Sequence, residues 1–252
     1  MNQPTDADDS WLLPPADVSP RPGEVHVWRA FLDQKLPHLP RLFGLLSADE
    51  RERAGRFRSE TDRQRFVVRR AALRIILGRC QGFEPRRLRF EYGPHGKPSL
   101  AEEFGGDALG FSVSHSRGAA VYAVARGRRV GVDVERVRPL PDAGQVARRF
   151  FSPGEAAALG AVAPDERLEA FYNCWTRKEA FVKACGEGLS RPLDTFDVTL
   201  APREAARLLS VEGDARNAAP WSMRSLTPAP GYRAALVVEG HDWRLACWRW
   251  TG

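Results

Sequence analysis

Two acidic residues are spaced so that a strand would present them side by side. In residues 131–135, the acids Asp133 and Glu135 alternate with valines. Alternate residues of a strand share one face, so the valines would enter the core and the two carboxylates would stand together on the opposite face. Carboxylates at that spacing repel each other unless one is protonated or a cation bridges them. The natural bridge is a hard divalent ion, and Mg²⁺ usually binds substrate phosphates as well.

A third acidic residue lies in a segment with helical periodicity, residues 168–185. Within it, Trp175, Glu179 and Lys183 are spaced four residues apart, which puts them on one stripe of a helix. If that stripe faces the predicted strand, the Glu179 carboxylate completes a metal site with the other two acids. Lys183 would then pair either with Glu179 or with a bound phosphate.

Both motifs also have an ordinary structural interpretation. Acidic residues on a strand face are often simply solvated, and an i,i+4 Glu–Lys pair often only supports its helix. An internal repeat separates the two interpretations. Four short segments recur in the same order in the two halves of the chain. In one pair, Ser47 and Ser152 each begin an S-x-x-E capping box, which opens a helix.

The repeat indicates which residues the fold itself requires. The first-half positions that correspond to the three acids are occupied by His26, Trp28 and Ala71. The first half is therefore expected to build the same elements without any of these acids. Their concentration in the second half favours a function, and with it the metal-site interpretation.

The order of the predicted elements gives the fold class. Each half should contain a strand, a capped helix, a longer helix, a loop and further strands, which is an α+β pattern with two similar lobes. The leading residues are rich in Pro and Asp, which predicts a flexible leader. Two facing lobes would enclose a cleft, a common place for ligands. The expected divisions are a leader at 1–22, an N-terminal lobe at 23–129 and a C-terminal lobe with the metal site at 130–252.

Basic residues gather in the first lobe, where they would face the acids across such a cleft. Lys97 lies in a Gly-Pro-rich loop, and His115 lies between Ser114 and Ser116 at the mouth of a predicted strand. Arginine binds phosphate in a bidentate manner, so a basic cluster opposite a metal suits a polyphosphate ligand. The ordinary alternatives are an arginine-coated helix face and a structural histidine. The arginines are Arg51, Arg53, Arg56, Arg63, Arg65, Arg69 and Arg70.

Composition and charge limit the classes of partner that are expected for this chain. The net charge is +6, which favours an anionic partner, although a solvated basic surface is the ordinary alternative. The basic residues are not interleaved with exposed aromatic residues, so nucleic acid is not expected as a partner. No apolar run is long enough to span a bilayer and the polar start lacks a signal peptide, which predicts a cytoplasmic protein without a membrane partner. The four cysteines form no C-x-x-C pair, which argues against a zinc or redox site.

Together these residues resemble the Sfp type (surfactin-synthetase-activating type) of 4′-phosphopantetheinyl transferase. Residues 131–135 match its G-(I/V)-D-(I/V)-E motif, and residues 175–180 match its W-x-x-K-E-(A/S) motif. The similarity runs from about Trp28 to Tyr232 in the family's order and spacing. The further matches are residues 96–98 and 114–116, which correspond to two upstream motifs, and residues 183–189, which correspond to K-x-x-G-x-G-L.

The resemblance implies a monomer of two lobes related by a pseudo-twofold axis, each a small antiparallel sheet packed with helices. Coenzyme A and Mg²⁺ would bind in the cleft between the lobes. Asp133, Glu135 and Glu179 would hold the metal, with one position filled directly or through water. Glu179 would also deprotonate the acceptor serine, and the residues implied in catalysis are Glu179, Lys183 and Asp133. The residues implied in coenzyme A binding are Lys97, Ser114, His115, Arg51, Arg53, Arg65 and Lys183.

One departure concerns the phosphate-binding helix. This chain has Glu50 where a lysine can occur in the family, with Arg51 and Arg53 nearby. Which arginine binds the nucleotide phosphate therefore stays open at this point.

The implied reaction is transfer of 4′-phosphopantetheine from coenzyme A to a serine of an apo acyl or peptidyl carrier protein, with release of 3′,5′-ADP. Mg²⁺ would neutralise the pyrophosphate, and a basic enzyme would attract an acidic carrier. Fatty-acid, polyketide and nonribosomal-peptide carriers all remain open as partners. Two alternatives also remain: a Mg²⁺-dependent hydrolase of a nucleotide-like pyrophosphate, and a non-catalytic module that binds carrier proteins or nucleic acid.

Overall fold

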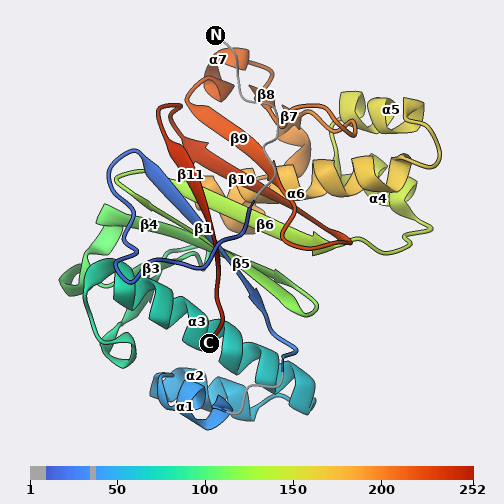
Figure 1. The fold of residues 1–252 in the computed structure, drawn as a ribbon. Coiled ribbons are helices and arrows are strands. Elements are labelled where there is room, and N and C mark those ends of the chain that lie inside the picture. Colours follow the sequence, from blue (N-terminus) through green and yellow to red (C-terminus); the bar gives the residue numbers. More distant parts are fainter. Residues whose placement is uncertain (1–9, 35–37) are drawn as a thin grey trace.

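The first lobe is built on a four-stranded sheet with its helices on one face. The computed structural model describes residues 10–34 and 38–252. The strand order is β11-β1-β5-β4, and in Figure 1 the helices of this lobe lie below the strands. The elements are β1 (Glu24–Phe31), α1 (Leu39–Gly44), α2 (Ala48–Gly55), α3 (Glu60–Gln81), β2 (Phe90–Tyr92), β3 (Pro98–Leu100), β4 (Leu109–Ser116) and β5 (Ala119–Arg126), with β11 (Arg244–Arg249) from the end of the chain.

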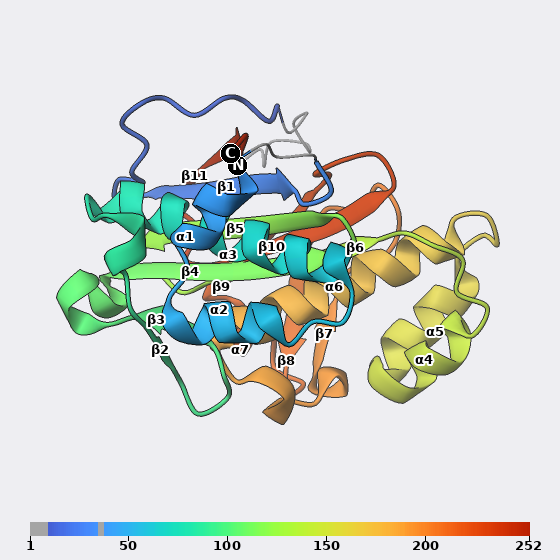
Figure 2. The same ribbon diagram turned by 90° about the horizontal axis from the view of Figure 1, so that it is seen from below.

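The second lobe is built on a three-stranded antiparallel sheet with strand order β6-β10-β9. In Figure 1 its helices lie on the other side of the strands from those of the first lobe, and in Figure 2 α4 and α5 project to one side. The elements are β6 (Val130–Arg136), α4 (Ala143–Phe150), α5 (Pro153–Ala161), α6 (Arg167–Cys185), β7 (Phe196–Val198), β8 (Leu208–Val211), α7 (Ala215–Ala218), β9 (Trp221–Leu226) and β10 (Tyr232–Glu239).

The internal repeat is confirmed in the order of the elements. Strands β1, β5 and β4 are antiparallel neighbours, and β6, β10 and β9 repeat that arrangement in the second lobe. Ser47 and Ser152 both begin capping boxes, as their sequences predict. The predicted α+β class is therefore correct, while the pseudo-twofold relation of the lobes stays a prediction.

The two ends of the chain depart from the predicted divisions. Strand β11 pairs in parallel with β1 of the first sheet, so the end of the predicted C-terminal lobe returns to the N-terminal lobe. Its alternating sequence predicts a strand, but the partner of a strand depends on non-local packing. Of the predicted leader, residues 1–9 lie outside the described residues. In the remainder, the Leu12 amide donates to the Cys247 carbonyl of β11, and Trp11 and Val18 are buried in the core. This part is therefore packed against the protein instead of loose.

The two sheets enclose a shared apolar core. Val132 and Val134 of β6 are buried against the valines and alanines of β1 and β5, as their alternation predicts. The opposite face of β6 packs against α6, and β4 lies beside β6 along the junction of the lobes. No helix among residues 10–34 and 38–252 is long and apolar enough to cross a membrane.

Each lobe ties its capped helix to its long helix through a buried ion pair. The capping-box carboxylate Glu50 binds Arg74 at 2.7 Å, and Glu155 binds Lys178 at 2.7 Å. All four side chains are nearly inaccessible to water. Lys178 also donates to the Phe196 carbonyl at 2.5 Å. The lysine of the W-x-x-K-E motif therefore has a structural role in α6.

Glu155→Gln should lower the free energy of unfolding by about 3 kcal/mol, because it leaves the Lys178 ammonium buried without a carboxylate. Urea denaturation followed by circular dichroism measures the change. The matched control is Glu166→Gln, which breaks an exposed pair with Arg203 and should cost less than about 1 kcal/mol. Equal losses for the two variants would contradict the structural role of the buried pair.

Candidate active site

A glycine allows α6 to lie directly on β6. A Cβ atom on Gly131 would come within 2.0 Å of the Ala180 carbonyl oxygen and 2.3 Å of the Ala184 nitrogen. Only a residue without a side chain permits this approach. It brings the stripe of α6 that carries Glu179 and Lys183 to the face of β6 that carries Asp133.

Asp133 is held by two donors and retains one unpaired oxygen. The residue is 4% exposed. Oδ1 accepts hydrogen bonds from Ser114 Oγ at 2.7 Å and from Lys183 Nζ at 2.6 Å. Oδ2 is buried and has no hydrogen-bond partner among the described residues. A buried carboxylate oxygen without a partner is costly, which indicates a place for a further donor or a cation.

The charge of Asp133 contributes to raised pKa values of the other two acids, Glu135 and Glu179. Desolvation raises the pKa of Glu135, repulsion from Asp133 adds to the rise, and a 2.6 Å hydrogen bond from Ser116 Oγ opposes it. Desolvation also raises the pKa of Glu179, with repulsion from Asp133 next in size. Lys183 lowers both pKa values. The three carboxylates therefore share one electrostatic environment, in which a cation would relieve the repulsion.

The donor set fits a hard divalent cation, although the side chains do not form a finished metal cluster. In the part of the chain that the structure describes, no group of three acidic, histidine or cysteine side chains is arranged to hold a metal. The Lys183 ammonium instead lies on Asp133. Three carboxylates, one of which has an unpaired buried oxygen, are nevertheless the oxygen-rich set that Mg²⁺ prefers. The metal ligands therefore stay a prediction.

A cationic cluster lies near Lys183. His115 projects from β4 and is exposed. Desolvation, followed by the charges of Arg69, Lys183 and Arg53, lowers its pKa to about 4. The Arg53 and Arg69 guanidinium groups lie 5.5 and 5.6 Å from the centre of the Phe66 ring. Among the described residues neither arginine has a carboxylate within ion-pair distance, and Arg69 Nε is buried without a partner. This cluster can accept an anion.

Other predicted phosphate ligands already have partners within the protein. Arg65 makes a two-pronged ion pair with Asp33, at 2.6 and 2.9 Å. Arg51 donates to the Gly44 carbonyl at 3.1 Å. Lys97 donates to the Lys183 carbonyl at 2.6 Å and so caps the end of α6. Arg51, Arg65 and Lys97 are therefore less available to a phosphate than Arg53 and Arg69, which have no carboxylate partner among the described residues.

Lys97 borders a pocket between the lobes. The pocket measures about 660 Å³ and is lined by the 93–99 loop, the start of β4, Arg129 and the end of α6. The family resemblance implies Lys97 in coenzyme A binding, and the pocket beside it is large enough to hold part of a small ligand.

Sequence reasoning missed two features of the site. Arg69 was one of several arginines on a predicted helix, and only the fold gives it a buried, unpaired nitrogen. Ser116 was noted as a neighbour of His115 within a family motif and without a predicted partner, yet it binds the Glu135 carboxylate. The available signal was the alternation of Ser112, Ser114 and Ser116 in an otherwise apolar strand.

The fold and the site define a two-lobed α+β protein in which acids on β6 and α6 meet cations from the first lobe. Residues 129–237 match the family model of the 4′-phosphopantetheinyl transferase superfamily, and residues 34–127 match the model of the N-terminal part of 4′-phosphopantetheinyl transferases. Two curated relatives extend these matches over most of the chain.

The 4′-phosphopantetheinyl transferase HetI of Nostoc sp. is 37% identical over 96% of this chain and 98% of its own length. The 4′-phosphopantetheinyl transferase Sfp of Bacillus subtilis is 31% identical over 80% of this chain and 86% of its own length. The chain belongs to the 4′-phosphopantetheinyl transferase family. It is an enzyme of the Sfp type, as its motifs predict.

Proposed function

We propose that this enzyme transfers 4′-phosphopantetheine from coenzyme A to a serine of an apo acyl or peptidyl carrier protein, in the presence of Mg²⁺. The observation that supports this most strongly is the buried, unpaired Oδ2 of Asp133, in a site that also contains Lys183 and lies near free arginines. Such a site suits a cation and a polyphosphate together. Family membership supplies the chemical class of the reaction.

Asp133, Glu135 and Glu179 would hold Mg²⁺, which when bound supplies neutralisation of pyrophosphate charge. The acceptor serine oxygen attacks the β-phosphorus of coenzyme A. A new P–O bond forms, the bond from that phosphorus to the bridging oxygen breaks, and 3′,5′-ADP leaves. Glu179 takes the serine proton, directly or through water. Desolvation raises the pKa of Glu179, which makes its carboxylate a stronger base than an exposed glutamate.

Lys183, His115, Arg53 and Arg69 would bind the phosphates. The Lys183 ammonium donates hydrogen bonds to Asp133 Oδ1 and Ser114 Oγ. A phosphate oxygen beside this ammonium would share it as a donor. Desolvation and the positive charges of Arg69, Lys183 and Arg53 lower the pKa of His115, so its imidazole is uncharged near neutral pH. A phosphate with two negative charges would offset the charges of Arg53 and Arg69 and would favour protonation of His115.

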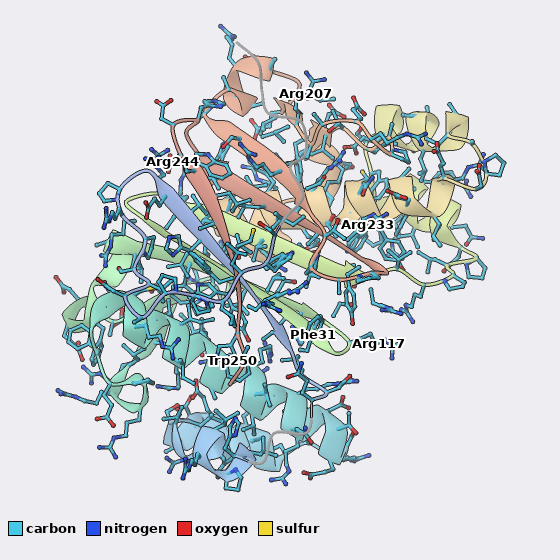
Figure 3. All side chains as sticks on the ribbon, in the orientation of Figure 1. Phe31, Arg117, Arg207, Arg233, Arg244 and Trp250 are labelled. Atoms are coloured by element: carbon cyan, nitrogen blue, oxygen red, sulfur yellow. The ribbon has the colours of Figure 1, made fainter. Side chains whose placement is uncertain are left out.

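An acidic carrier protein would be attracted to arginines beside the acids. Arg117 forms the tip of the β4–β5 hairpin (Figure 3) and Arg136 ends β6. The Arg136 amide donates to Ser116 Oγ, which places the two residues at the same end of the site. Arg117 is exposed and holds a φ of +53°, a conformation that costs energy for a residue other than glycine. Such strain at a site is consistent with a functional role.

Arg117→Glu should lower kcat/KM for the carrier about tenfold at low salt, because a like charge would repel an acidic partner. The KM for coenzyme A should not change, and the defect should shrink at high salt. The control is Arg207→Glu, an exposed arginine that lies well away from Arg117 in Figure 3. A defect that ignores salt, or an equal defect in the control, would count against carrier docking at this end.

The test of the proposed function is incubation with coenzyme A, Mg²⁺ and several apo carrier proteins, followed by intact-mass measurement. We expect one phosphopantetheine on the carrier serine, no modification of a Ser→Ala carrier, and 3′,5′-ADP in solution. Free phosphopantetheine without carrier modification would instead identify a hydrolase. If coenzyme A were consumed in none of the reactions, the non-catalytic binding module would be the interpretation that fits.

A further inference from the structure

Three serines of β4 connect the two lobes. Strands β4 and β6 belong to different sheets, yet they lie side by side. Ser112 Oγ accepts from the Val132 amide at 3.1 Å, and Ser114 Oγ donates to Asp133 at 2.7 Å. Ser116 Oγ donates to Glu135 at 2.6 Å and accepts from the Arg136 amide at 3.1 Å. The serine side chains thus bridge the junction of the two sheets.

Ser114 and Ser116 differ in how far the carboxylate that each one binds depends on it for its orientation. Asp133 Oδ1 has a second donor, Lys183 Nζ, so the Asp133 side chain stays anchored without Ser114. Glu135 has Ser116 as its one hydrogen-bond donor in the described part of the chain. A glutamate has three rotatable side-chain bonds, and fixing them costs free energy that a bound metal would otherwise have to supply. The orientation of Glu135 therefore depends on Ser116.

We propose that Ser116 is a positioning residue that orients the Glu135 carboxylate of the second lobe toward the bound metal. The inference rests on the proposed function, because it assumes that Glu135 is a metal ligand. It extends that function by making metal affinity depend on a hydroxyl from the first lobe. Partners that hold metal-binding carboxylates commonly change metal affinity by about 10- to 100-fold when they are removed.

The test measures Mn²⁺ binding to the full chain by electron paramagnetic resonance, without turnover, alongside stability. Ser116→Ala should weaken Mn²⁺ binding about tenfold, and Ser116→Thr, which keeps the hydroxyl, should restore most of the affinity. The matched control is Ser112→Ala, which removes a neighbouring junction serine that binds only a backbone amide. It should lower the unfolding temperature and leave Mn²⁺ affinity unchanged.

The possible results distinguish a failure of the proposed Ser116 role from a failure of the proposed metal site. Wild-type affinity in Ser116→Ala, or equal losses in Ser116→Ala and Ser112→Ala, would overturn the positioning role while leaving metal-dependent transfer by the wild-type enzyme intact. If the wild-type enzyme transferred phosphopantetheine but bound no Mn²⁺, the metal site and this inference would both fail. Weaker Mn²⁺ binding in Ser116→Ala alone, with rescue by threonine, would support the proposal.

Discussion

Glu179→Gln should reduce phosphopantetheine transfer about a thousandfold and leave the enzyme at least as stable as wild type at neutral pH. The change removes the proposed base, which commonly contributes about 10²- to 10⁴-fold, and one proposed metal ligand. Stability should not fall, because the folded protein raises the pKa of Glu179 and so disfavours its charged form.

The sign of this stability effect depends on pH. Below the ordinary glutamate pKa of 4.5 the side chain is protonated in both folded and unfolded chains, so glutamine gives no advantage. As the pH rises from 4.5 through the higher pKa of the folded state, the unfolded chain ionises first, so wild type loses stability and Glu179→Gln does not. Urea denaturation at pH 4 and pH 7 should therefore show a relative gain for the variant only at the higher pH.

The control for transfer is Glu169→Gln, on the same helix, which breaks only a 2.8 Å ion pair with Arg233. It should retain wild-type transfer, measured as carrier modification with saturating coenzyme A. Normal transfer by Glu179→Gln would rule out the proposed base. Unfolding of that variant at neutral pH would contradict the predicted stability.

Gly131→Ala should destabilise the fold by about 3 kcal/mol or more and abolish transfer. The added methyl group would meet α6 backbone atoms, at 2.0 Å from one oxygen and 2.3 Å from one nitrogen. A backbone cannot rotate away as a side chain can, so α6 must move off β6. Overpacking of this kind commonly costs about 1–3 kcal/mol and occasionally more. Separation of the helix from the strand would also move Glu179 from Asp133.

The matched control is Gly160→Ala in α5, where an added Cβ has no atom within 4 Å. Alanine favours a helix over glycine, so this variant should be neutral or slightly more stable. Thermal unfolding and carrier modification measure both variants. If Gly131→Ala unfolded at the wild-type temperature, the close contact between α6 and β6 would be wrong.

The sequence predicts local features of this fold well, because strand alternation and helix capping are short-range. The valines of β6 enter the core and both capping boxes form as expected. The partner of β11 was not predictable, since strand pairing joins residues that are far apart in the chain.

The sequence predicted the types of residue in the site better than it predicted the contacts that those residues make. Arginines in a basic helix look alike in sequence, but the fold pairs Arg65 with Asp33 and leaves Arg69 Nε unpaired. Lys97 likewise caps α6 because the 93–99 loop reaches the other lobe. The partners of long charged side chains depend on tertiary packing, which the spacing of residues does not encode. The role of Ser116 was hidden for the same reason.

The most direct test of the central claim is a crystal structure of the enzyme with coenzyme A and Mn²⁺, using the anomalous signal of the metal. We expect one peak in contact with oxygen atoms of Asp133 and Glu179, directly or through water at Glu135, and with the pyrophosphate. Lys183 should then leave Asp133 for a phosphate oxygen. A bound coenzyme A whose metal lies away from these three acids would contradict the account.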